Sequence, residues 1–112
     1  MTVTEWPAYL LRQIPADTRA LLSEQAAADD VSLSDVVRLA LCARYRLECD
    51  PQSFGYQPAL DTGNDVILIR MQPAVWRALK KEAGASRTTP ARYGLTKQII
   101  LQAIDDYLRE TA

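Results

Sequence analysis

Few side chains in this sequence are suited to catalysis or to metal binding. The 112 residues include no histidine, so the commonest general base and the commonest metal ligand are missing. Cys42 lies in a segment with helical periodicity and Cys49 just beyond it, and we interpret both as plain thiols of a reducing compartment. No nucleophile stands beside a base in the sequence. We therefore expect no enzyme activity, no metal site and no cofactor.

Arginine is the chemically active residue that recurs with a fixed spacing. Residues 12–24 and 70–82 share the pattern R-x-x-P-A-x-x-R-A-L-x-x-E, with seven identities in thirteen positions at an offset of 58. Arg12 and Arg70 each stand three residues before a proline. Common helix formers explain part of the match, but not the paired arginine and proline. We interpret the pattern as an internal duplication.

Each copy predicts a short strand followed by two helices. The strands are expected over 9–13 and 65–71, and a proline ends each one at a place that suits a first helical turn. The first helices are expected over 16–28 and 74–84, with apolar stripes of Thr18, Leu21, Leu22 and Ala26 in one and Val75, Leu79 and Ala83 in the other. The second helices begin at 32–35 and 94–97, at an offset of 62. Their stripes are Leu33, Val37, Leu41 and Tyr45, then Leu95, Ile99, Ala103 and Tyr107.

These elements predict one compact domain that is mainly α-helical with a short two-stranded antiparallel β-ribbon. A lone strand with two helices cannot bury its apolar side, whereas two copies can pair their strands over a common helical core. The expected organisation is an N-terminal arm (1–8), a first unit (9–47), a linker rich in turn formers (48–64) and a second unit (65–112).

The two strand-helix-helix units resemble the ribbon-helix-helix family, to which the Arc and MetJ repressors belong. The resemblance implies a tandem form, in which one chain supplies both copies as a pseudo-dimer. It also implies that the ribbon enters the DNA major groove and reads bases with its outward side chains. If Ile67, Ile69 and Met71 point inward, the base-reading candidates are Leu10, Arg12, Gln13, Leu68 and Arg70. Gln13 joins this face if Ile14 is the last inward residue of the first strand, as a bulge would allow.

The family also binds phosphates at the start of the second helix, where free backbone N–H groups and the helix dipole favour an anion. The matching residues are Ser32, Leu33 and Ser34 in the first unit and Gly94, Leu95, Thr96 and Lys97 in the second. Ser32 and Asp35 also resemble a capping box. Lys97 adds a positive charge, whereas Asp35, at the equivalent place, is expected to repel phosphate. The two half-sites are therefore expected to be unequal.

Net charge and apolar residues limit the function. A net charge of −1 counts against a nonspecific nucleic-acid coat. Leu10, Val66 and Leu68 are apolar on the expected DNA face, where they touch thymine methyl groups, lie under the Trp6–Pro7 segment or bind a protein. The leading hypothesis is a sequence-specific transcriptional repressor, with a double-stranded DNA operator and more than one chain on it. The alternative is a protein-binding module, an antitoxin or a phage-type inhibitor.

The location of the protein follows from what the sequence lacks. No apolar run approaches the roughly 18 residues of a membrane span. The first seven residues show no basic segment followed by an apolar one, which is the sign of a secretory signal. We therefore expect a cytoplasmic protein without a membrane partner.

Overall fold

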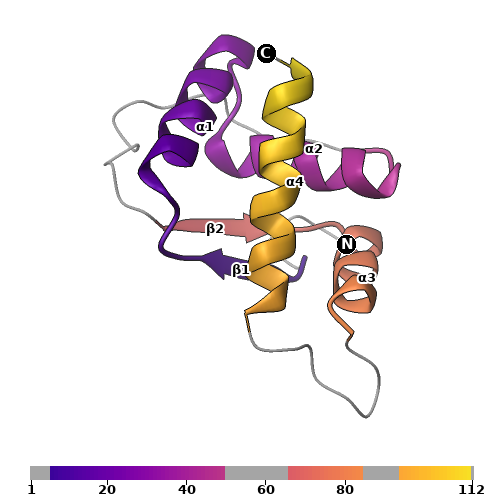
Figure 1. The fold of residues 1–112 in the computed structure, drawn as a ribbon. Coiled ribbons are helices and arrows are strands. Elements are labelled where there is room, and N and C mark those ends of the chain that lie inside the picture. The colour runs from indigo at the N-terminus through magenta and orange to yellow at the C-terminus, as the bar shows by residue number, and fades with distance from the viewer. Residues whose placement is uncertain (1–5, 50–65, 85–93, 112) are drawn as a thin grey trace.

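The elements follow one another in the order that the sequence predicts. In a computed structural model the chain is mainly helical with one two-stranded antiparallel sheet (Figure 1). The structure describes residues 6–49, 66–84 and 94–111. Its elements are β1 (Ala8–Leu11), α1 (Ala16–Asp29), α2 (Leu33–Tyr45), β2 (Ile67–Arg70), α3 (Pro73–Glu82) and α4 (Leu95–Thr111). Most of the predicted arm (1–8) and of the predicted linker (48–64) lies outside the described residues.

The ribbon is built from one strand of each half, which confirms the predicted antiparallel pairing. Leu10 lies opposite Leu68, with Tyr9 opposite Ile69 on one side and Leu11 opposite Ile67 on the other. Leu10 and Leu68 are also matched by the 58-residue offset of the sequence repeat. Exchanging the two strands by that offset leaves the three pairs around Leu10 and Leu68 in place, whereas the pair of Ala8 and Arg70 would become Val66 and Arg12, which lie beyond the ladder. The first strand is shorter and earlier than predicted, at 8–11 rather than 9–13.

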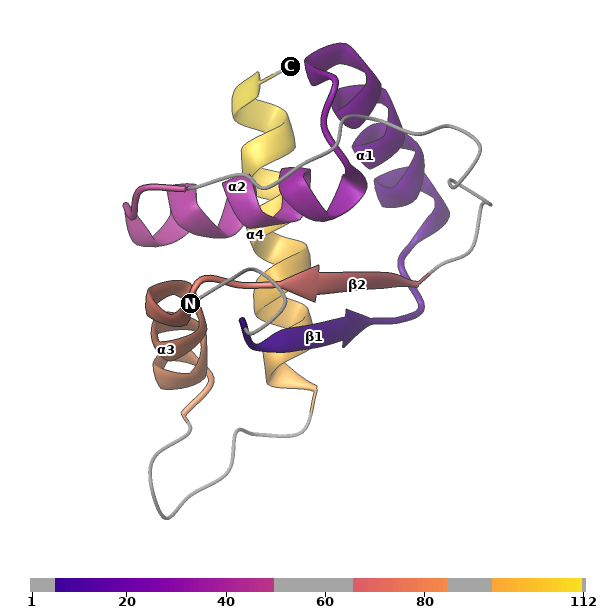
Figure 2. The same cartoon turned by 180° about the vertical axis from the view of Figure 1, so that it is seen from behind.

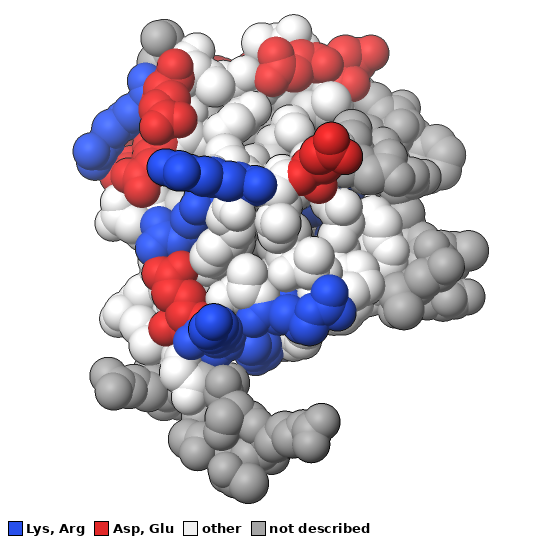
Figure 3. All heavy atoms as spheres, turned by 90° about the vertical axis from the view of Figure 1, so that its right-hand side faces the viewer, with Lys and Arg blue, Asp and Glu red and all other residues white. Residues whose placement is uncertain are grey.

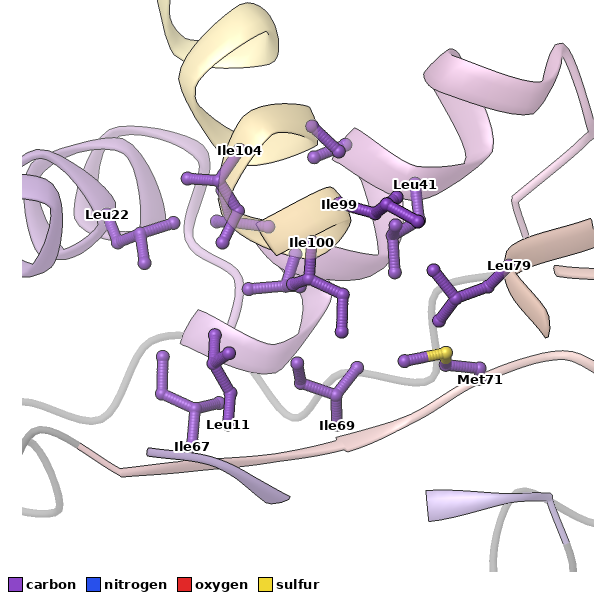
Figure 4. Close-up of a cluster of buried hydrophobic side chains, with 14 of the residues drawn as sticks. Leu11, Leu22, Leu41, Ile67, Ile69, Met71, Leu79, Ile99, Ile100 and Ile104 are labelled. Carbon is purple, nitrogen blue, oxygen red and sulfur yellow. The ribbon is translucent and has the colours of Figure 1, made fainter. Parts of the chain in front are cut away.

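One face of the ribbon carries the core. Leu11, Ile67, Ile69 and Met71 are at most 5 % exposed and point toward the helices (Figure 4). They meet buried side chains from all four helices, which include Leu22, Leu41, Leu79, Ile99, Ile100 and Ile104. Burying each such side chain contributes about 1.5–3 kcal/mol. The strands are short, but their inward side chains anchor them in the hydrophobic core.

A left-handed residue follows the first strand. Gln13 has φ of 55°, a conformation that L-residues seldom adopt. Leu11 and Ile14 are both buried, while Arg12 and Gln13 between them are exposed. Ile14 is therefore the last inward residue, and Gln13 shares the outer side with Arg12. This arrangement is reached without a bulge in the ladder, because the regular pairing of β1 ends at Leu11 and the change of direction occurs beyond it.

This extra residue changes the phase of α1 relative to α3. Leu21 was expected in the apolar stripe, but it is 48 % exposed, whereas Leu22 is fully buried. Beyond Gln13 the buried residues of the two halves align at an offset of 57, as in Ile14 with Met71, Leu22 with Leu79 and Ala26 with Ala83. Leu21 and Leu79 are therefore matched by the sequence repeat but not by the structure, because Leu21 is exposed and Leu79 is buried.

The second helices match their predicted positions. Ser32 caps α2, and its side chain accepts a hydrogen bond from the backbone N–H of Asp35 at 3.2 Å. Buried residues of α2 and α4 align at the predicted offset of 62, in the pairs Val37 with Ile99, Arg38 with Ile100, Leu41 with Ala103 and Cys42 with Ile104. The two helices lie against each other and form the centre of the fold (Figure 2).

Candidate nucleic-acid interface

The outer face of the ribbon is apolar at its centre. Leu10 is 39 % exposed, Leu68 is 48 % exposed and Val66, beside the start of β2, is 41 % exposed. In Figure 2 the ribbon passes in front of α4, with this face toward the viewer. The Trp6–Pro7 segment leaves all three side chains accessible, so the expectation that it covers them is wrong. The outer face of the ribbon thus exposes a group of large apolar side chains to solvent.

Arginines stand toward both ends of this face. Arg70 is half-buried and lies opposite Ala8, one outward position away from Leu68. Arg12 is exposed and lies one outward position beyond Leu10, next to the exposed Gln13. Leu10, Leu68 and Arg70 thus occupy outward positions of the ribbon, and Arg12 and Gln13 are exposed just beyond the end of β1.

Two side chains of α2 hold the free edge of β2. The Ser34 hydroxyl donates to the Leu68 carbonyl oxygen at 2.7 Å, and Arg38 Nη1 donates to the Arg70 carbonyl oxygen at 3.3 Å. Ser34 and Arg38 are four residues apart on α2, and Leu68 and Arg70 are two residues apart on β2. The two distances along the chain are similar, so both hydrogen bonds can form at once. They satisfy backbone groups that β1 does not reach. These bonds hold the backbone of Leu68 and Arg70 and so favour the outward direction of both side chains.

Arg38 is balanced by a buried carboxylate. Asp35 is fully buried and forms an ion pair with Arg38, which is 5 % exposed. Burial lowers the pKa of Arg38 but the partner compensates for its charge. The expectation that Asp35 repels phosphate loses its basis, because this carboxylate lies inside the protein beside a cation.

The predicted phosphate-binding residues divide into inward and outward groups. Ser34 is half-buried and its hydroxyl is bonded to β2, and the side chain of Thr96 is buried. Leu33 and Leu95 are half-buried against the core. The remaining residues are near the surface, namely Ser32, Gly94 and Lys97. In Figures 1 and 2 α2 lies above β2 and the start of α4 lies below β1, so the helix starts flank the ribbon on opposite sides.

Charge is unevenly spread over the two halves. Helix α3 carries three basic residues and one acidic residue, whereas α1 carries one basic residue and three acidic residues. Figure 3 shows the side on which α3 lies, where basic side chains form a row with acidic ones beside and above it. Lys80 Nζ lies 4.5 Å from the centre of the Trp76 ring, a cation–π distance. The net charge of −1 therefore conceals a locally basic helix.

No protein-family model, no curated protein and no solved structure matches this chain. Within residues 6–49, 66–84 and 94–111, no group of three or more His, Cys, Asp or Glu side chains is placed to hold a metal ion. None of the helices in these ranges combines the length and the apolar character that crossing a bilayer requires. The function must therefore be argued from the surface itself.

The thiols are placed for packing. Cys42 is buried, and its Sγ lies 3.5 Å from Gln72 Oε1, while Cys49 is half-buried. Hydrogen bonding with Cys49, together with burial, raises the pKa of the Cys42 thiol. Cys42 is thus protonated at neutral pH and is a poor nucleophile.

Sequence reasoning missed Ser34 and Arg38 as supports of the ribbon. The available signal was the polar triad of Ser34, Asp35 and Arg38 around the apolar stripe of α2. Polar residues on the buried side of a helix need partners, and an arginine four residues after a serine matches alternate strand carbonyls.

Proposed function

We propose that this protein is a tandem ribbon-helix-helix protein that binds a specific sequence of double-stranded DNA with its β1–β2 ribbon, as a cytoplasmic transcriptional repressor. The observation that carries the proposal is the register of the ribbon. The repeat matches the paired Leu10 and Leu68 with each other and exchanges the pairs on either side of them, and an arginine follows two residues later in each half. A surface with this approximate two-fold symmetry suits an approximately palindromic duplex.

The dimensions and chemistry of the ribbon support the same proposal. A two-stranded ribbon fits the major groove, which is about 12 Å wide, and arginine makes paired hydrogen bonds to guanine. Arg12 and Arg70 are the proposed base readers, with Gln13 beside Arg12. The helix starts at Ser32 and at 94–97 lie on opposite sides of the ribbon, where their N–H groups would contact phosphates. Lys97 adds charge in one half only, so we propose an imperfect palindrome bound by more than one chain.

Selection from random DNA duplexes, with the purified chain at low salt, tests this function. We expect one enriched motif. Arg12→Ala and Arg70→Ala should each weaken its binding by about 1–3 kcal/mol and relax the preference at one position. Arg109→Ala is the matched control, because Arg109 pairs with Asp105 on α4 and its side chain is 73 % exposed.

The result that overturns the proposal is equally plain. It fails if no motif is enriched and if the binding of both ribbon variants equals that of the wild-type chain. Thermal melting of each variant separates lost binding from lost folding. The Arg70→Ala variant keeps the hydrogen bond from Arg38, because Arg38 donates to the backbone carbonyl oxygen of Arg70 and not to its side chain.

A protein-binding module is the second candidate, favoured by the exposed apolar centre of the ribbon. Leu10, Val66 and Leu68 are each 39–48 % exposed, and base-reading ribbons usually carry polar side chains. A protein partner would lose affinity with Leu68→Asp and would be indifferent to Arg12→Ala. A DNA site would respond to both.

A further inference from the structure

The central pair of the outer face limits which bases it tolerates. Leu10 and Leu68 are cross-strand neighbours, so their side chains form one apolar patch between the two arginines. In the major groove the only apolar group on a base edge is the C5 methyl of thymine. A leucine against the donors and acceptors of a G·C pair would remove them from water without replacing their hydrogen bonds. The pair therefore favours thymine and disfavours G·C.

The arginines set the distance to the next readable bases. Arg70 lies opposite Ala8, and Arg12 lies four residues further along the same strand, so their Cα atoms are separated by roughly 13 Å along the ribbon. One base pair advances about 3.4 Å along the duplex axis, and the groove runs obliquely to it. This span corresponds to about three to four base pairs. Because the arginines come from opposite strands of the ribbon, their targets lie on opposite DNA strands.

We infer that the DNA bound by the ribbon has thymines at its centre, with their methyl groups packed on Leu10 and Leu68, and one guanine on each strand about three to four base pairs apart. This inference rests on the proposed function and adds the class of base sequence. Lys97 and the other features of the helix starts do not enter it, since phosphate contacts carry no direct sequence information.

Replacement of thymine by deoxyuridine isolates the methyl group, because base pairing and the polar edge stay unchanged. In the selected duplex, deoxyuridine at the two central thymines should weaken binding roughly tenfold, since a buried methyl group is worth about 0.8 kcal/mol and some solvent contact remains. The same substitution outside the site should change binding less than about twofold. For the double variant Leu10→Ala, Leu68→Ala the central penalty should fall below about twofold, because the packing partner of the methyl is gone.

A matched control variant is Leu21→Ala. Leu21 is as exposed as Leu68, at 48 %, but it belongs to α1 and not to the ribbon. This variant should keep the full deoxyuridine penalty. Since Leu10, Leu68 and Leu21 are all accessible, their truncation should leave the fold intact, and circular dichroism checks this.

The outcomes separate the inference from the function beneath it. Absence of any enriched motif overturns the proposed function and this inference with it. An enriched motif without central thymines, or one whose central thymines tolerate deoxyuridine, overturns the inference alone. Central thymines with a penalty that the double leucine variant abolishes support both.

Discussion

The first half of the chain (β1, α1 and α2) and the second half (β2, α3 and α4) use the same elements but stabilise them by different chemistry. At the free edge of β2, Ser34 and Arg38 of α2 bond to the strand carbonyls, and Asp35 neutralises Arg38. The 62-residue offset aligns Arg38 with Ile100, which is fully buried in the core (Figure 4). The arginine of the ion pair in one half thus occupies the place of an isoleucine in the other.

Helices α1 and α3 also differ in their polar contacts. Glu82 at the end of α3 accepts hydrogen bonds from Arg44 Nε at 3.0 Å and Tyr45 Oη at 2.7 Å. The 57-residue offset aligns Glu82 with Gln25, a neutral residue whose Oε1 lies 3.4 Å from Thr111 Oγ1. Apolar packing is common to both halves, whereas directed polar contacts tie α2 to β2 and to α3. We infer that these contacts set the position of α2 more than they add to stability, because buried ion pairs seldom exceed an apolar replacement in energy.

The largest expected effect breaks the buried ion pair. Arg38→Ala should lower the free energy of unfolding by about 3–5 kcal/mol, because it leaves Asp35 charged, buried and unpaired. Urea unfolding followed by circular dichroism measures the change. The double variant Asp35→Leu, Arg38→Ile replaces both charges with apolar side chains, as Ile100 does at the place of Arg38, and should recover most of the loss.

Two outcomes would contradict this view. A double variant as unstable as Arg38→Ala would mean that the hydrogen bond to Arg70, and not the charge balance, dominates. A single variant with wild-type stability would mean that the pair contributes nothing. Arg109→Ala, which breaks the exposed pair with Asp105, should change stability by less than about 0.5 kcal/mol.

The second prediction tests the phase difference between α1 and α3. Leu22→Ala and Leu79→Ala should each destabilise by about 2–4 kcal/mol, because both side chains are fully buried. Leu21→Ala should cost less than about 1 kcal/mol, although Leu21 is the residue that the sequence repeat matches with Leu79. Thermal melts rank the three variants. Equal losses of stability for Leu21→Ala and Leu79→Ala would contradict the 57-residue alignment of α1 with α3 and support the 58-residue one.

A smaller and pH-dependent effect is expected at Glu82. Hydrogen bonding to Arg44 holds the pKa of Glu82 below its usual value of 4.5, so the contact stabilises the fold above that pH and is lost as Glu82 becomes protonated below it. Glu82→Gln should cost about 0.5–1 kcal/mol near pH 7, as partly exposed pairs do. In urea titrations at several pH values, the gap between wild type and variant should narrow below pH 4.5. A gap independent of pH would assign the loss to packing.

The smallest expected effect concerns the left-handed residue of the first half. Gln13→Gly should stabilise the chain by up to about 0.5–1 kcal/mol, because glycine adopts φ of 55° without the cost that a side chain incurs. Arg12→Gly is the neighbouring control and should not stabilise. A destabilised Gln13→Gly would show that the glutamine side chain, and not the backbone, holds this turn.

Sequence reasoning predicted the order of the elements, the antiparallel ribbon and the inward side of β2, because alternation along a strand is strict. It misplaced Leu21, since Leu21 and Leu22 are adjacent leucines and the identities of the repeat favoured the wrong one. The residue with positive φ shifts the buried residues of α1 by one position relative to α3, and Gln13 is not a residue type that signals this conformation.

The candidate site was predictable only in its local part. The outward positions of Leu10, Arg12 and Leu68 follow from alternation and from the repeat. The bonds from Ser34 and Arg38 join residues that are 34 and 32 positions apart, and no local pattern specifies such a pairing. The pair of Asp35 and Arg38 is itself local, three residues apart on α2, but its burial depends on the packing of that side of α2 against the rest of the fold.

Because β1 and β2 belong to one chain, formation of the ribbon does not depend on protein concentration. A ribbon made from two separate chains forms in a bimolecular step, so its melting temperature rises with protein concentration. Here the second strand belongs to the same chain, so its effective concentration does not depend on the concentration of the protein. The folded ribbon is therefore insensitive to dilution. At low copy number the chain would keep the ribbon assembled without a second chain to supply one of its strands.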